Sequence, residues 1–134
     1  MKSSGQTIAL FSEVGILIKG RMQAMLPLPF SQCQTLSFIA DKEKPSMQDV
    51  ARHFKITAPS ATFLVEELAR SGLITRHANS KDRRKVEVML TQKGKTVFKK
   101  IIKVREKVLH RMFQTLTESD RADLNRILKK ITAT

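Results

Sequence analysis

Two groups of side chains in the middle of this chain have the chemistry needed to bind a polyanion. The first is the run Lys81, Asp82, Arg83, Arg84 and Lys85. Arginine suits a narrow, electronegative groove because its guanidinium is permanently charged and donates to several acceptors. Asp82 stands two residues before Arg84 and can orient it. We expect this run to form a cationic loop that contacts nucleic acid, in preference to a merely solvated turn.

The second group is neutral and polar, and it precedes the cationic run. It consists of Thr57, Ala58, Pro59, Ser60, Thr62 and Phe63. Hydroxyls beside the free N–H groups of a helix N-terminus can contact phosphates and base edges. The alternative is that these hydroxyls only cap and solvate the helix end. Arg76, between the two groups, completes the set of expected nucleic-acid contacts.

The elements that must position these side chains are two short helices joined by a turn. Ser46 is expected to cap a helix over Met47–Phe54, with Asp49 as its capping-box partner. Thr57 is expected to cap the next helix, Ala58–Ser71, and Gly72 to end it. This pattern predicts a helix-turn-helix whose second helix reads DNA.

A β-hairpin and longer helices complete the expected fold. The strands are Leu73–His77 and Lys85–Leu90, around the cationic loop. The remaining helices are expected over Gln6–Met25, which Pro27 and Pro29 end, over Ser31–Ala40, from Thr91 onward, and after a capping box of Thr117 and Asp120. The fold class is therefore mainly α (α+β), with about six helices and one β-hairpin wing.

The charge of the chain is high and concentrated. At 134 residues the chain is expected to form one domain, and its net charge of +13 and pI near 10.4 favour nucleic acid over a membrane as partner. Residues 70–111 hold fourteen of the twenty-five Lys and Arg and only three acids, a net +11. Within them, Lys95, Lys99, Lys103 and Lys107 recur every four residues, which favours a solvated helix face.

Other functions lack their motifs in this sequence. Cys33 is the only cysteine, so a reducing, cytoplasmic location is expected, and a small buried side chain is favoured over a redox sensor. His53, His77 and His110 lack metal-ligand spacing, and neither a nucleophile elbow nor a phosphate-cradling glycine loop appears. We expect no enzyme activity, no cofactor and no membrane span.

Apolar residues also line the first and last helices, beyond what one small winged core needs. Burial against a second copy would give a two-fold dimer, which suits palindromic DNA. The alternative is that all of this surface packs within one chain.

Four segments make the sequence resemble the MarR family of winged-helix transcriptional regulators. They are SMQDVARHFKITAPSATFLVEEL, GLITR, DRRKVEVMLTQKG and LTESDRADLNRIL. The resemblance implies a single MarR-type domain over 1–134, with a winged helix-turn-helix lobe over 31–90 and a helical dimerisation region over 1–26 and 91–134. It also implies that Arg84 is the wing-tip arginine, that Asp82 orients it with Arg83 adjacent, and that Thr57, Ser60 and Thr62 face outward.

The functional expectation is a sequence-specific regulator, a dimeric repressor associated with the nucleoid and relieved by a small-molecule effector. The first alternative is an architectural protein that coats DNA with little sequence preference, which the acidic Glu66–Glu67 pair and the excess of lysine suggest. The second alternative is a winged helix that docks only proteins, and the localised positive charge argues against it.

Overall fold

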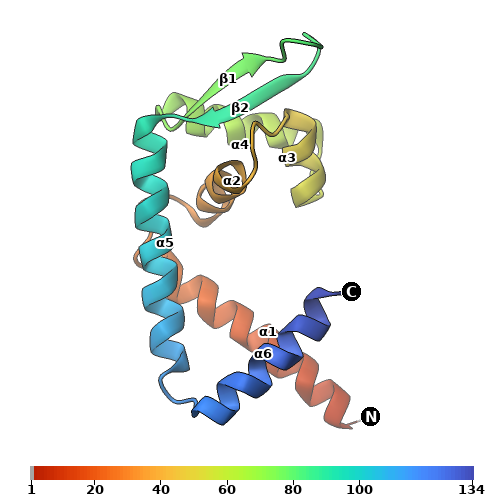
Figure 1. Cartoon of the computed structure of the whole chain (residues 1–134), viewed down its shortest axis with the longest axis vertical. Helices are drawn as coiled ribbons and strands as arrows, with labels where there is room; N and C mark the ends of the chain where they lie inside the picture. The colour runs from red at the N-terminus through yellow and green to blue at the C-terminus, as the bar shows by residue number, and fades with distance from the viewer. Residues whose placement is uncertain (1) are drawn as a thin grey trace.

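The chain forms six helices and one two-stranded antiparallel sheet in a computed structural model that describes residues 2–134 (Figure 1). In chain order the elements are α1 (Lys2–Gln23), α2 (Phe30–Asp41), α3 (Met47–Phe54), α4 (Ala58–Arg70), β1 (Ile74–Ala78), β2 (Val86–Leu90), α5 (Gln92–Phe113) and α6 (Glu118–Thr132). This arrangement confirms the expected fold class. Met1, the first residue of the expected N-terminal region, lies outside the described residues.

Local capping signals set several helix ends as predicted. The Ser46 N–H donates to Asp49 Oδ2 at 2.9 Å and the Asp49 N–H donates to Ser46 Oγ at 3.1 Å, which closes the capping box of α3. The first of these bonds lowers the pKa of Asp49. Thr117 and Asp120 close the same box at α6. Side-chain oxygens near a helix start therefore determine where α3 and α6 begin.

Other boundaries differ slightly from the sequence predictions. α1 ends at Gln23, before Met25 and well before the two prolines that were expected to end it. α4 ends at Arg70, and Gly72 follows in the left-handed region with φ of 75°. Glycine adopts this conformation without steric cost, which explains why it follows the helix.

The hydrophobic core lies inside the lobe formed by α2, α3, α4, the hairpin and the start of α5. Leu36, Val50, Val65, Leu68 and Val88 are all fully buried there. They come from one face of each helix and of β2, as the apolar spacing predicts. This core fixes α4, the helix that is expected to read DNA, against the rest of the lobe.

The segment that precedes α3 helps to hold the hairpin in place. β1 pairs with β2 from Ile74↔Leu90 to Ala78↔Val86. The Val88 N–H donates to the Pro45 carbonyl at 2.9 Å, and Ser46 forms a bridge with Glu87. The segment that precedes α3 therefore acts as a short third partner for the sheet.

A closely packed, hydrogen-bonded junction joins the end of α4 and the hairpin to the start of α5. The Thr91 N–H donates to the Leu73 carbonyl at 3.0 Å, and its hydroxyl donates to the Gly72 carbonyl at 2.6 Å. A Cβ added at Gly94 would collide with the Leu73 carbonyl oxygen. Gly94 therefore permits a backbone approach that a larger residue would prevent.

α1 and α6 extend away from the lobe along the far half of α5, and α1 contacts α5 and α2 (Figure 1). Nine large apolar side chains on these two helices are exposed in the described chain. They are Ile8, Leu10, Phe11, Val14, Ile16, Leu17, Ile127, Leu128 and Ile131. The described part of one chain therefore leaves this surface uncovered.

The junction generates a stability prediction. We expect Gly94→Ala to destabilise the protein by about 1–3 kcal/mol, because the added methyl group must displace the Leu73 backbone. Urea unfolding at fixed protein concentration measures the change. Gln92→Ala, on an exposed residue of the same helical turn, is the control and should leave the midpoint nearly unchanged. Equal midpoints for the two variants would contradict the role given to Gly94.

Candidate nucleic-acid interface

The reading helix α4 presents one face to the core and the opposite face to solvent. Ala61, Val65 and Leu68 are buried against the lobe. Thr57 caps the helix as predicted, and its Oγ1 accepts the Ser60 N–H at 3.3 Å. The Thr57 hydroxyl also lies 3.0 Å from Ser60 Oγ. These two hydroxyls therefore cap the helix while they remain exposed to a ligand.

Most of the predicted contact residues on α4 face outward. Thr57, Ala58, Pro59, Ser60 and Phe63 are exposed. Thr62 is half-buried, because its angle around the helix places it at the boundary between the buried and the outward face, so it faces outward only in part. The outward face near the start of α4 thus combines small hydroxyls with one large aromatic ring.

The loop of the hairpin is organised by Asn79, a residue that the sequence analysis did not single out. Its Oδ1 accepts the N–H groups of Lys81 and Asp82 at 2.8 and 2.9 Å. Its own N–H donates to the Lys85 carbonyl at 2.9 Å. An asparagine that opens a polar loop is the signal for such a turn.

Asp82 contacts Arg84 as predicted from their spacing. Its Oδ1 accepts both the Arg84 backbone N–H at 3.1 Å and Arg84 Nε at 3.2 Å. The Arg84 guanidinium, and then its backbone N–H, lower the pKa of Asp82. The Arg84 side chain is nevertheless 92% exposed. Asp82 therefore holds the inner edge of the guanidinium and leaves its outer nitrogens directed toward solvent.

Arg76 lies apart from the loop and contacts the reading helix instead. Its Nη1 is 3.7 Å from Glu66 Oε1 on α4. On the same helix, Arg70 donates to Glu67. Both glutamates in the middle of α4 therefore have cationic partners, which offsets the negative charge that the sequence places there.

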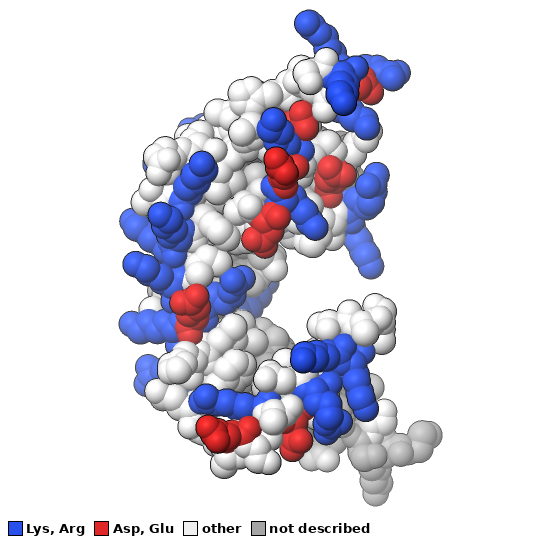
Figure 2. Space-filling view, in the orientation of Figure 1, with Lys and Arg blue, Asp and Glu red and all other residues white. Residues whose placement is uncertain are grey.

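Basic side chains form clusters at several places on the surface. Figure 2 shows blue groups at the tip of the hairpin and along the outer edge of α5. Lys95, Lys99, Lys103 and Lys107 are exposed on α5. This exposure agrees with the expected solvated face.

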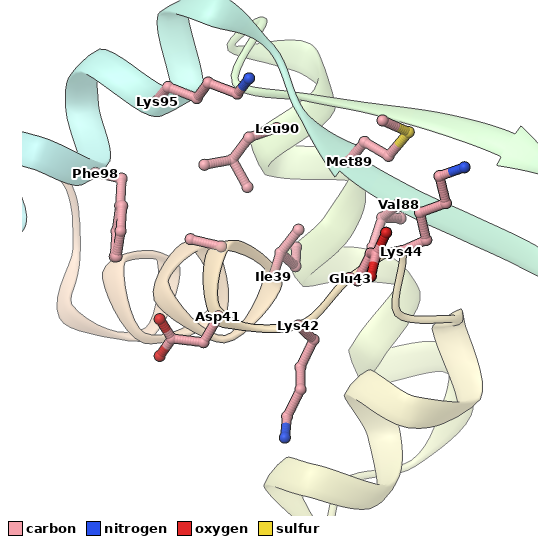
Figure 3. Close-up of a pocket in the computed structure, with 11 residues that line it drawn as sticks. Ile39, Asp41, Lys42, Glu43, Lys44, Val88, Met89, Leu90, Lys95 and Phe98 are labelled. Atoms are coloured by element: carbon pink, nitrogen blue, oxygen red, sulfur yellow. The ribbon is translucent and has the colours of Figure 1, made fainter.

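A cavity of about 490 Å³ opens where the end of α2, β2 and the start of α5 meet (Figure 3). Its apolar lining includes Ile39, Val88, Leu90 and Phe98. In Figure 3, Lys44 and Lys95 lie on opposite sides of this apolar centre, and Asp41 and Lys42 point away from it. Glu43 lies close to Lys44 in the same view, so the cavity combines an apolar floor with a rim that carries charges of both signs.

The remaining candidate groups have other environments. Cys33 is buried, and its thiol lies 3.5 Å from the Leu28 carbonyl. Burial raises the pKa of Cys33, which disfavours the reactive thiolate and agrees with the expected packing role. His53 stacks on Phe38 with ring centroids 4.2 Å apart. Within residues 2–134, no three His, Cys, Asp or Glu side chains form a group that could hold a metal.

A membrane-crossing helix is also not found in the described part of the chain. Neither of the two longest helices, α1 and α5, is apolar enough over a sufficient length.

Comparison with known proteins finds similarity to one family. A sequence model described as the MarR family matches residues 26–85, which include α2, the helix-turn-helix and most of the hairpin. The HTH-type transcriptional repressor MdtR of Bacillus subtilis (strain 168) is 23% identical over 141 residues, which cover 98% of this chain and 89% of MdtR.

Solved structures agree over almost the whole fold. A MarR family protein from Bacillus stearothermophilus aligns with a TM-score of 0.89 at 17% identity, over 98% of this chain and 94% of that chain. S. aureus MepR in its DNA complex aligns with a TM-score of 0.78 at 20% identity, over 93% of this chain and 95% of the MepR chain. The family match over residues 26–85, the repressor similar over nearly the whole chain and the shared fold agree with the resemblance to the MarR family seen in the sequence, and the fold is that of the MarR winged-helix proteins.

Proposed function

We propose that this protein is a sequence-specific DNA-binding regulator, a dimeric repressor that acts in the cytoplasm at the nucleoid and catalyses no reaction. The observation that carries the proposal is the placement of two different recognition surfaces on one lobe. α4 presents exposed hydroxyls at its start, and the hairpin presents the exposed Arg84. The similarity to MepR, whose structure contains DNA, and to the repressor MdtR supports the same conclusion.

In this proposal the two surfaces enter different grooves. The first turns of α4 lie in the major groove, where base edges are distinguishable. The hairpin loop enters the minor groove, where the potential attracts arginine. The proposed DNA contacts are Thr57, Ala58, Pro59, Ser60, Thr62, Phe63, Lys81, Asp82, Arg83, Arg84 and Lys85, with Asp82 acting through Arg84. Arg76 acts at the edge of this surface, through Glu66.

The dimer is proposed from the uncovered apolar surface of α1 and α6. Two copies that meet there would bury it and relate their lobes by a two-fold axis. Residues 1–26 and 91–134 then form the dimerisation region, and 31–90 form the DNA-binding lobe. An inverted repeat in the operator would match this symmetry.

We expect the purified protein to select an inverted repeat from random duplexes as a dimer. Phe11→Asp places a charge in the proposed contact, so this variant should sediment as a monomer and lose affinity for the selected repeat. Lys129→Asp, which places a charge on the side of α6 opposite the exposed Ile131, is the control and should remain dimeric.

Two results would contradict this proposal. If the duplexes selected by the wild-type protein share no sequence, and if selected and random duplexes bind with nearly equal affinity, the protein is the architectural alternative. A Phe11→Asp variant that stays dimeric would place the dimer contact elsewhere.

For the hairpin, we expect Arg84→Ala to weaken binding to the selected operator by about tenfold, because a guanidinium in the groove is lost. Fluorescence anisotropy at a fixed, moderate salt concentration measures the affinity. Lys99→Ala removes a cation from the solvated face of α5 and should change the affinity far less. If both variants lose affinity equally, a general loss of positive field explains the effect, and Arg84 has no special contact.

The cavity between α2, β2 and α5 is the proposed entry site for a small-molecule effector. Its volume of about 490 Å³ is in the range of small-ligand sites. The loop at its edge is bonded to β2 through the Pro45 carbonyl and the Val88 N–H. A ligand that displaces this loop would therefore move the hairpin, and Lys95 on the α5 side of the rim would attract an acidic group of the ligand.

Anilinonaphthalene sulfonate, a fluorescent apolar anion, is a suitable probe for this cavity. We expect its binding to weaken in Lys95→Glu, which reverses a charge at the cavity rim, and to persist in Lys99→Glu, one helical turn away and outside the lining. Fluorescence titration of both variants makes the comparison. Equal binding to the two variants would exclude this cavity as the site of the probe.

A further inference from the structure

Phe63 is exposed on the reading helix, where a large apolar side chain is not explained by packing. It is 63% exposed and lies on the face of α4 opposite Ala61 and Val65, which are buried. Almost all other exposed large apolar side chains of the described chain belong to α1 and α6 or lie just after α1. Phe63 is therefore outside the surface that a second copy would cover.

The neighbours of Phe63 limit what this part of α4 can recognise. Glu66 and Glu67, which follow on the same helix, have Arg76 and Arg70 as ion-pair partners. Arg70, the last residue of α4, is the only cation in the helix. The first two turns of α4 itself consequently carry no cation to recognise guanine, for which arginine is the commonest partner.

A phenyl ring can recognise a different feature of the major groove. Thymine alone among the four DNA bases carries a C5-methyl group there, and apolar side chains contact it. Phe63 lies in the second turn of α4, at the end of the helix that enters the groove in helix-turn-helix proteins. The ring would lose exposed apolar surface on such a contact, which is favourable.

We propose that Phe63 is a specificity-determining residue that selects thymine in each operator half-site through its methyl group. This inference rests on the proposed DNA-binding function and names what the reading helix selects. Recognition by α4 then depends on apolar contact together with the hydroxyls of Thr57 and Ser60. The arginine loop contributes affinity and position, and Phe63 contributes base preference.

Deoxyuridine tests this inference because it removes the methyl group and keeps the hydrogen-bonding edge of thymine. Each thymine of the selected operator is replaced singly, and affinity is measured by fluorescence anisotropy. For wild-type protein we expect one position per half-site to lose about fourfold in affinity, the effect of one buried methyl group. For Phe63→Ala the thymine and deoxyuridine operators should bind equally.

Two further variants serve as controls. Ser60→Ala, on the same face of α4, should retain the preference for thymine over deoxyuridine. Phe63→Leu keeps an apolar side chain and should retain part of that preference. Circular dichroism and sedimentation confirm that each variant is folded and dimeric.

The outcomes separate this inference from the proposed function. If no thymine position discriminates in the wild type, or if Phe63→Ala keeps the full preference, the inference is overturned, whereas selection of an operator and its dependence on Arg84 would still stand. If Phe63→Ala changes sedimentation but not operator affinity, Phe63 contacts protein, and the inference is likewise overturned. If the wild-type protein binds no duplex, both the inference and the proposed function are overturned.

Discussion

The close approach of Gly94 to the Leu73 carbonyl is the constraint on which the arrangement of this protein depends. At this point the end of the reading helix, the base of the hairpin and the start of α5 meet within a few residues. Thr91 bonds both Gly72 and Leu73, and the Lys93 ammonium donates to the Ser71 carbonyl at 2.9 Å. Because α5 is a single long helix, its orientation is determined here, and with it the position of the lobe relative to α1 and α6.

The sequence predicted the local features of this fold well. Capping at Ser46, Thr57 and Thr117 depends on side chains within three residues of the helix start, so residue type and spacing are sufficient. The burial of Leu36 and Val65 follows equally from helical periodicity. The contact of Asp82 with Arg84 was also accessible, because only one residue separates them.

Features that depend on the packing of distant segments could not be predicted in this way. The Gly94–Leu73 approach and the Arg76–Glu66 pair join residues of different elements, and nothing in their local sequence specifies these contacts. Thr62 was expected to face outward, but its angle around α4 places it at the boundary of the core. The candidate site was therefore predicted by residue type, whereas the partner that neutralises Glu66 needed the fold.

The apolar surface of α1 and α6 has a consequence for how much active protein a cell contains. If two copies hide this surface from water, the paired form is favoured by mass action, and its amount rises with about the square of the chain concentration when most chains are unpaired. Dilution would expose side chains such as Ile8 and Ile16 and leave each chain less resistant to unfolding and proteolysis. Occupancy of DNA would then respond steeply to the rate at which the chain is synthesised.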